Sequence, residues 1–402
     1  MPGTFSKSFK ILIADKTCSD LVHPGLTCME AMKLNLVDGI IGGLKFYLPI
    51  FLIPLFMKIK DWKKVKTWKD FLKGYGRSCL FALCLNFCSF TGICFTYKWL
   101  PLFLTLPAGI GSLFFCFVPP KVRKAEGQGM FNMYVEFLIR RSRSKLIASI
   151  RQSKVVVTLL FSILNTCIVY GYLRKASINF WFTSFRITKQ ENDDKTLAKG
   201  CKLIHDEITC FDYLKQELKQ TAKFAFALAA IKAIPGRISM LYKQPLEMPK
   251  RLLTKFDYEM FMFIMSLNGI FKYLFCLLNR KSRFSIETNC IVSSLISGVG
   301  FLFYPQYIVF TMAMTNAVES IYHCIEQSFK SRGKELPLVM KLINKFPLVY
   351  FMFLFTAGLD IQLRILYPSL VNKYTHKILS VLTNGKGDEL AKNVIKLMIG
   401  FE

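Results

Sequence analysis

Two stretches decide the fold, "AGIGSLFF" at residues 108–115 and "SGVGFLFY" at residues 297–304. Each lies in a hydrophobic run, and each carries a Gly-x-Gly followed one residue later by Leu-Phe and another aromatic residue. A glycine has no Cβ atom, so it lets the backbones of neighbouring membrane helices approach closely. We therefore predict one equivalent, closely packed helix in each half of the chain; a glycine-lined path for a substrate is the alternative. The predicted helix-packing glycines are Gly109, Gly111, Gly298 and Gly300.

The composition around these stretches is that of a membrane protein. Of 402 residues, 52% are hydrophobic, and the mean hydropathy is +0.35. Several runs reach membrane-spanning length, and bilayer-exposed segments must satisfy their backbone polar groups internally, so we expect an all-α, polytopic helical protein. The clear spans are Ile40–Met57, Cys79–Tyr97, Leu100–Val118, Val155–Leu173, Met260–Leu278, Cys290–Tyr304, Tyr307–Tyr322 and Leu348–Leu366. Two weaker segments, Gly127–Ile139 and Ala222–Met240, bring the expected total to about 8–10 membrane helices.

Short features recur in the same order in the two halves, which predicts an internal duplication with a period of about 183 residues. The chain would then consist of a first membrane repeat (1–186), a second membrane repeat (187–366) and a C-terminal tail (367–402). The matching features are Cys18/His23/Cys28 with Cys201/His205/Cys210, Leu85-Asn86 with Leu267-Asn268, Gly109-x-Gly111 with Gly298-x-Gly300, and Val135-Glu136 with Val318-Glu319.

The number of helices in a repeat sets its orientation in the membrane. If both weak segments span the bilayer, each repeat has five helices and the second repeat is inverted relative to the first, as in many secondary transporters. If they lie on the surface, this argument fails. In the tail, apolar residues line one side of two segments, so we expect surface-lying amphipathic helices there.

Basic residues are present in nearly every polar connection. The chain has 54 Lys and Arg against 26 Asp and Glu, a formal net charge of +28. We expect these loops to attract anionic lipid headgroups. Nucleic acid is not an expected partner, because no compact soluble domain carries the charges. The 13 Cys contain no Cys-x-x-Cys and lie largely in or beside apolar runs, which fits a reducing compartment.

Charged side chains inside apolar runs are the candidate functional residues. A carboxylate in a bilayer is costly and usually faces the interior of the helix bundle. We expect Glu136 and Glu319 to face the interior, with Glu319 paired with Lys272 or Lys45. Two interpretations stay open: an ion pair or hydrogen bond that stabilises the bundle, or a polar lining for a substrate path.

The sequence predicts neither an enzyme nor a cofactor. It contains no Walker A loop, no Gly-x-Ser-x-Gly and no His-Glu-x-x-His, and only four His. The Cys/His triplets hold ligand-type residues, but zinc takes four ligands and each triplet offers three. We therefore predict no metal site and treat these residues as ordinary thiols and a capping His, with one site shared between the triplets as the alternative.

The residues also resemble those of the transmembrane protein 135 family, also called peroxisomal membrane protein 52. The resemblance rests on His23-Pro24, on "GIIGGLKFYLPIFLIPLFMKIKDW" (39–62), on "SSLISGVGFLFYPQYIVFTMAMTNAVESIY" (293–322) and on "AGLDIQLRILYPS" (357–369). It implies a multi-pass protein of the peroxisomal membrane, also associated with mitochondria, that acts in lipid homeostasis and mitochondrial dynamics. No catalytic residue is carried over from the family.

Two functions follow from this resemblance together with the repeats. In the first, the protein moves or holds a lipid or fatty acid between the two repeats. In the second, it is a non-transporting membrane adaptor whose basic loops and amphipathic tail recruit protein partners for organelle division. A membrane enzyme that uses His323 is a third and weaker alternative, because the sequence shows no partner residues for that histidine.

Overall fold

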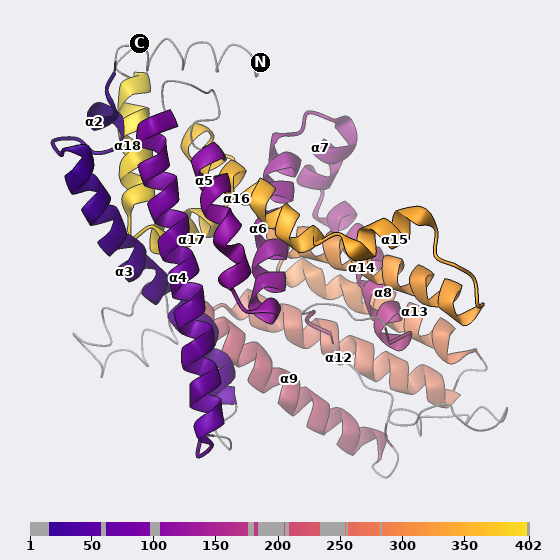
Figure 1. The fold of residues 1–402 in the computed structure, drawn as a ribbon. Helices are drawn as coiled ribbons and strands as arrows, with labels where there is room; N and C mark the ends of the chain where they lie inside the picture. The colour runs from indigo at the N-terminus through magenta and orange to yellow at the C-terminus, as the bar shows by residue number, and fades with distance from the viewer. Residues whose placement is uncertain are drawn as a thin grey trace. The chain divides into compact units, whose positions relative to one another are not determined.

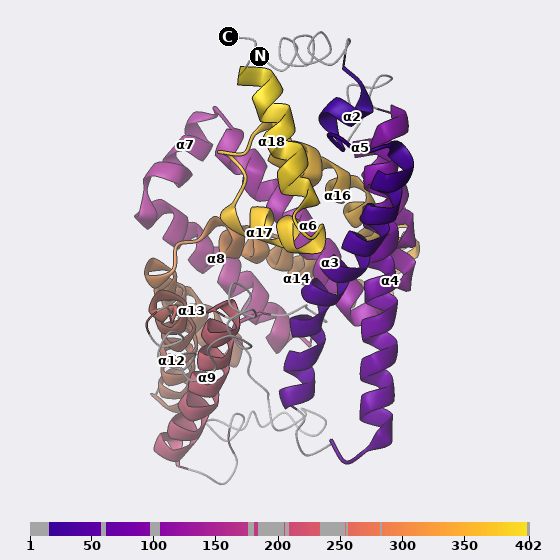
Figure 2. The same ribbon diagram turned by 90° about the vertical axis from the view of Figure 1, so that its left-hand side faces the viewer.

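The computed structural model describes residues 16–57, 62–96, 105–175, 181–183, 205, 209–233, 254, 256–281 and 284–399. Every regular element in these ranges is a helix (Figures 1 and 2). The chain divides into two compact units, one made of residues 1–141 and 342–402 and the other of residues 142–341. Each unit is described by itself below.

Unit 1 joins the start of the chain to its end. From the N-terminal part it contains α2 (Cys18–Leu21), α3 (Cys28–Met57), α4 (Val65–Thr96), α5 (Thr105–Ser112), the 3-10 helix η2 (Leu113–Phe117) and α6 (Pro120–Arg141). From the C-terminal part it contains α16 (Leu348–Leu366), α17 (Lys373–Leu382) and α18 (Lys386–Ile399). Helix α3 packs on α4, α4 on α5, and α16 on both α5 and α6 (Figure 1).

Unit 2 consists of the middle of the chain. It contains α7 (Lys145–Gln152), α8 (Lys154–Leu173), α9 (Cys210–Ala233), α12 (Tyr258–Lys281), α13 (Ile286–Ser297), the 3-10 helix η5 (Gly298–Phe303) and α14 (Tyr307–Ser331). The unit boundary lies within α15 (Leu338–Lys345). Helix α9 packs on α12, α12 on α13, and α8 on both α13 and α14.

The prediction of a helical, polytopic membrane protein is confirmed. Six helices in the described ranges are long and apolar enough to cross a bilayer. They are Cys28–Leu52, Val65–Thr96, Lys154–Leu173, Tyr258–Lys281, Ile286–Phe303 and Leu348–Leu366. Thr105–Phe117 is apolar but shorter. The expected spans Tyr307–Tyr322 and Gly127–Ile139 lie in α14 and α6, which are not among the six, and Ala222–Met240 extends past α9 beyond the described residues.

The two units are built from the same contacts. In unit 1, Phe81 of α4, Phe115 of η2 and Phe353 of α16 form a buried group in which Phe115 and Phe353 stack with centroids 3.7 Å apart. In unit 2, the buried residues Phe263 of α12, Phe301 of η5 and Phe161 of α8 form a similar group, with a stacked Phe161–Phe301 pair at 4.2 Å. In each unit a stacked phenylalanine pair therefore joins a 3-10 helix to a membrane helix.

One helix in each group comes from the other half of the sequence. Helix α8 closes the first predicted repeat but packs in unit 2, and α16 closes the second but packs in unit 1. The compact units therefore differ from the predicted boundaries at residues 186 and 366. This pattern is what two duplicated halves with exchanged last helices would produce, so sequence repeats and compact units need not share their boundaries.

The C-terminal helices are amphipathic, as predicted, but their apolar sides pack on unit 1 and do not lie bare on its surface. Leu382 of α17 belongs to a buried cluster with Tyr47 and Phe81. Leu390 and Val394 of α18 belong to a second cluster, with Phe90, Ile93 and Ile365. The apolar stripes expected to face a membrane surface are thus used for packing inside the unit.

Three of the four predicted glycines lie at close contacts. A Cβ atom on Gly111 would lie 2.9 Å from Leu85 Cα, and one on Gly300 would lie 3.0 Å from Leu267 N. These are matching positions on α4 and α12. A Cβ atom on Gly298 would lie 2.3 Å from Ser162 Oγ of α8. Gly109 differs, because a Cβ atom there would meet nothing within 4 Å.

We predict that Gly111→Ala lowers the free energy of unfolding by about 1–3 kcal/mol, because the added methyl meets the backbone of α4. Gly109→Ala is the matched control on the same helix and should be neutral or slightly stabilising, since Ala favours helix over Gly. Thermal unfolding of the detergent-solubilised chain measures both. Equal melting temperatures for the two variants would contradict the packing role of Gly111.

Candidate functional site

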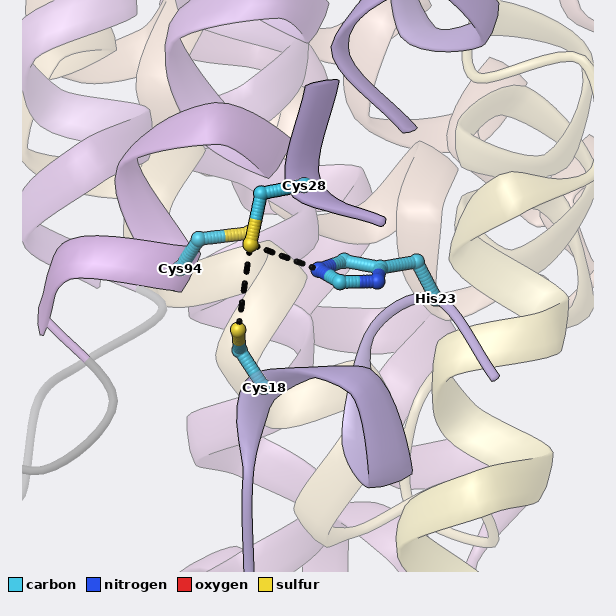
Figure 3. A group of neighbouring side chains, drawn as sticks. All are labelled: Cys18, His23, Cys28 and Cys94. Atoms are coloured by element: carbon cyan, nitrogen blue, oxygen red, sulfur yellow. Dashed lines mark hydrogen bonds between the residues drawn. The ribbon is translucent and has the colours of Figure 1, made fainter. Parts of the chain in front are cut away.

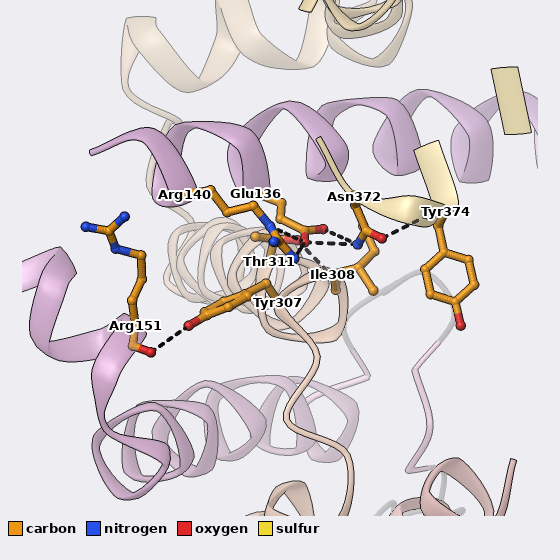
Figure 4. A network of polar contacts seen from close by, with 8 residues as sticks. All are labelled: Glu136, Arg140, Arg151, Tyr307, Ile308, Thr311, Asn372 and Tyr374. Atoms are coloured by element: carbon orange, nitrogen blue, oxygen red, sulfur yellow. Dashed lines mark hydrogen bonds and ion pairs between the residues drawn. The ribbon is translucent and has the colours of Figure 1, made fainter. Parts of the chain in front are cut away.

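Glu136 is a predicted intramembrane acid, and its carboxylate accepts hydrogen bonds from two neighbouring side chains (Figure 4). Its side chain is 1% exposed. Arg140, one helical turn later on α6, donates to Oε1 from Nε at 2.9 Å and from Nη2 at 2.7 Å. Asn372 Nδ2 donates to both carboxylate oxygens, at 2.9 and 2.8 Å. Asn372 also accepts from Tyr374 N and caps α17. Glu136 therefore fastens the start of α17 to α6, which favours the stabilising interpretation.

The two predicted lysines have partners other than Glu319. Lys272 is 5% exposed and forms an ion pair with Glu217 of α9. Lys45 donates to Asn384 Oδ1 at 2.7 Å, after α17. Within unit 2, Glu319 lies 3.8 Å from His323 Nε2. The expected pairing of Glu319 with Lys272 is replaced by the Lys272–Glu217 pair, which joins α12 to α9.

Glu326 corresponds to Glu136 better than Glu319 does. Helix α6 ends at Arg141 and α14 at Ser331. Counted back from these ends, Glu136 and Glu326 occupy the same position. Each acid is paired one turn later, Glu136 with Arg140 at 2.7 Å and Glu326 with Lys330 at 2.8 Å. The Val-Glu match in the sequence at offset 183 therefore does not mark the equivalent acids.

Two further acids in unit 1 each have one buried carboxylate oxygen that is unsatisfied among the described residues. Glu126 of α6 accepts a hydrogen bond from Tyr47 OH at 3.1 Å on Oε2, while Oε1 has no partner. Burial raises the pKa of Glu126 from 4.5 to about 8, against a smaller lowering by the Tyr47 hydrogen bond. Asp360 of α16 is 3% exposed, and its Oδ2 has no hydrogen-bond partner among the described residues.

An apolar groove of about 530 Å³ lies between α5 and α16 in unit 1. Its lining residues are Thr105, Leu106, Gly109, Ile110, Leu113, Phe351, Leu354 and Phe355. Gly109, the predicted packing glycine with no close neighbour, is therefore in the groove wall. The neighbouring side chains Ile110, Leu113 and Phe355 are at least half exposed.

The Cys/His triplet of the first half gains a fourth member in the fold (Figure 3). Thr27 and Glu30 cap the start of α3 through mutual hydrogen bonds, which places Cys28 as the first residue of the helix. Cys94, near the end of α4, lies with Cys18, His23 and Cys28, and their ligand-type atoms are all within 4.8 Å of one another. Burial, followed by the neighbouring Cys28, raises the pKa of the Cys18 thiol.

Unit 2 contains a similar cluster, with three described Cys and His residues from the second half of the chain. Thr209 and Asp212 form a similar hydrogen-bonded pair at the start of α9, where Cys210 is the first helical residue. Cys210, the buried His205 and Cys276 of α12 have their ligand-type atoms within 4.8 Å of one another. Cys201, the remaining member of the predicted triplet, lies outside the described residues.

Sequence reasoning missed Cys94 and Cys276, although a signal for both was present. Cys276 follows Cys94 by 182 positions, the same offset that relates His23 to His205 and Cys28 to Cys210. A repeat search extended to every cysteine would have found them. Glu217 has no such signal, because nothing in the sequence shows which face of α9 meets Lys272.

Comparisons with known proteins give no relative: no family model, no curated protein and no solved structure matches the chain.

We predict that the melting temperature of the protein falls as pH rises from 4.5 to about 8, in part because Glu126 must ionise while buried. A carboxyl whose pKa is raised in the folded state stabilises the protein most at pH values below the pKa it has in the unfolded chain. This stabilisation is lost as pH rises through the pKa it has in the folded chain. Glu126→Gln should flatten the curve and be more stable than the wild type at the alkaline end. Thermal unfolding across this pH range measures the difference.

Glu335→Gln is the control for this experiment, because Glu335 is exposed and pairs with Lys341 at the surface. An exposed pair contributes little, so this variant should follow the wild-type curve. Parallel curves for wild type and Glu126→Gln would show that Glu126 does not titrate as its burial requires.

Proposed function

We propose that this protein is a multi-pass organelle membrane protein that holds a lipid acyl chain in the groove between α5 and α16. The groove of about 530 Å³ carries the proposal. Its size is within the range of roughly 300–1,000 Å³ common for small-molecule sites. The groove suits the lipid-handling function expected from the resemblance. In this proposal the lipid lies in unit 1, and no path shared between the repeats is required.

The position of the groove indicates which kind of molecule would bind in it. One wall is α16, a candidate membrane-spanning helix, and the other is the apolar segment Thr105–Phe117. At bilayer depth the surrounding medium is lipid, so an open apolar groove is filled by acyl chains and not by water. A lipid gains little hydrophobic energy on leaving the bilayer for such a groove, so its selection must come from shape and close packing.

The paired acids and lysines favour holding a lipid over conducting a charged substrate. Glu136 is bonded by Arg140 and Asn372, and Lys272 is bonded to Glu217. Satisfied charges of this kind stabilise a bundle, and opening a polar path through them would break these bonds. The peroxisomal membrane, with mitochondria as a second place, and the role in lipid homeostasis are supported by the resemblance alone.

We predict that Gly109→Trp reduces photo-crosslinking of a diazirine-labelled phospholipid to α5 and α16 by about threefold or more. The indole would occupy the groove and remove several close atomic contacts between the lipid and the groove wall, each worth ~0.1–0.2 kcal/mol. The measurement is peptide mapping of crosslinked sites in the full chain, reconstituted in liposomes.

Gly76→Trp is the matched control, because a Cβ atom on Gly76 of α4 also meets nothing within 4 Å and Gly76 does not line the groove. It should leave the labelling of α5 and α16 unchanged. Equal labelling in wild type and Gly109→Trp would contradict the groove as a lipid site.

We also predict that the fluorescently tagged full chain co-localises with a peroxisomal membrane marker, with a smaller fraction on mitochondria. Alkaline carbonate extraction should leave it in the membrane pellet, as expected for a protein whose described residues include six candidate membrane-spanning helices. Exclusive residence in the plasma membrane would contradict the organelle assignment while leaving the groove unaffected.

A further inference from the structure

The first Cys/His cluster has the donor set of a metal site. Three sulfurs and one imidazole nitrogen come from α2, the turn after it, the first residue of α3 and the end of α4 (Figure 3). Cys18 Sγ lies 3.5 Å from Cys28 Sγ, and Cys28 Sγ lies 3.6 Å from His23 Nε2. All five cysteines of the two described clusters are free thiols and form no disulfide.

These separations are the edges of a tetrahedron around one ion. Two thiolates bound to zinc at 2.3 Å in tetrahedral geometry lie about 3.8 Å apart, and a thiolate and an imidazole nitrogen lie slightly closer. A disulfide would bring two sulfurs to about 2.05 Å. All four donor atoms of the first cluster are within 4.8 Å of one another. A two-iron cluster would spread its ligands over two metal atoms, so this compact set favours a single ion.

His23 is prepared to bind through Nε2. Its other ring nitrogen, Nδ1, lies 2.9 Å from Leu26 O. A carbonyl oxygen only accepts, so Nδ1 carries the proton and Nε2 has a free lone pair directed at the sulfurs. Metal-binding histidines almost always donate their second nitrogen in this way, which fixes the tautomer and the ring orientation. The His23 side chain is also buried, which keeps the ring in place.

The second half repeats the donors at the same places in its helices. His205 Nε2 lies 3.6 Å from Cys276 Sγ, and Cys210 is the first residue of α9 as Cys28 is of α3. His205 is held by stacking on Tyr213, with ring centroids 4.8 Å apart. An ion bound in each unit would require an imidazole beside the thiols at both places, which is the arrangement found.

We propose that each half of the chain binds one Zn²⁺. In the first half the ligands are Cys18, His23, Cys28 and Cys94; in the second half they include His205, Cys210 and Cys276. Thiolate and imidazole ligands in a tetrahedral set select zinc over Mg²⁺ or Ca²⁺, which prefer oxygen. With four protein ligands, the first site is closed and structural: it fastens α2 and the turn after it to the ends of α3 and α4.

The test measures zinc in the full chain, purified in detergent under reducing conditions without a chelator. We expect two zinc ions per chain by elemental mass spectrometry. Cys94→Ser and Cys276→Ser should each lose one ion. Cys84→Ser on α4 and Cys167→Ser on α8 are matched controls, because both thiols are half-buried outside the clusters, and both variants should keep two ions.

A spectroscopic test on the wild-type chain does not depend on the folding of any variant. Replacing zinc by Co²⁺ should give the d–d bands of tetrahedral cobalt with thiolate-to-metal charge transfer. Less than a tenth of an ion per chain, equal zinc in Cys94→Ser and Cys84→Ser, or iron with acid-labile sulfide would each overturn the proposal.

Discussion

Each unit depends on one contact. In it, a phenylalanine of a 3-10 helix stacks on a phenylalanine of a membrane helix from the other half of the sequence. Lipid tails are as apolar as a helix surface, so the hydrophobic effect does not drive membrane helices together and close packing must do so. The Phe115–Phe353 and Phe161–Phe301 pairs supply that packing, and Phe81 and Phe263 extend it to a third helix. Each pair also ties one half of the sequence to the other.

The sequence predicted the class of fold because apolar length and backbone hydrogen bonding determine it locally. The recurrence of Gly109-x-Gly111 and Leu85-Asn86 also located equivalent helices, and Gly111 does contact Leu85. The exchange of α8 and α16 was not predictable, because a linear repeat shows which segments correspond but not which unit they enter. For the same reason the apolar stripes of α17 and α18 were assigned to a membrane surface instead of to unit 1.

The candidate site shows the same division between local and long-range information. The Glu136–Arg140 pair is one helical turn apart and can be read directly from the sequence. The bond from Asn372 to Glu136 crosses 236 positions and has no local signal. Cys94 is an intermediate case, because it is distant from His23 in the sequence but is identified by the position of Cys276 in the repeat. A sequence feature that recurs thus carries three-dimensional information that a single occurrence does not.

The side chains near Gly109 in unit 1 and near Gly298 in unit 2 differ in size. Ser162 of α8 follows the stacked Phe161, and Leu354 of α16 follows the stacked Phe353. In unit 2, Ser162 is small enough for α8 to close on Gly298, where a Cβ atom would lie 2.3 Å from its Oγ. In unit 1, Leu354 is bulky, and Gly109 faces open space in the groove that Leu354 helps to line. Both glycines are present, and the helices close at Gly298 beside a serine but leave a groove at Gly109 beside a leucine.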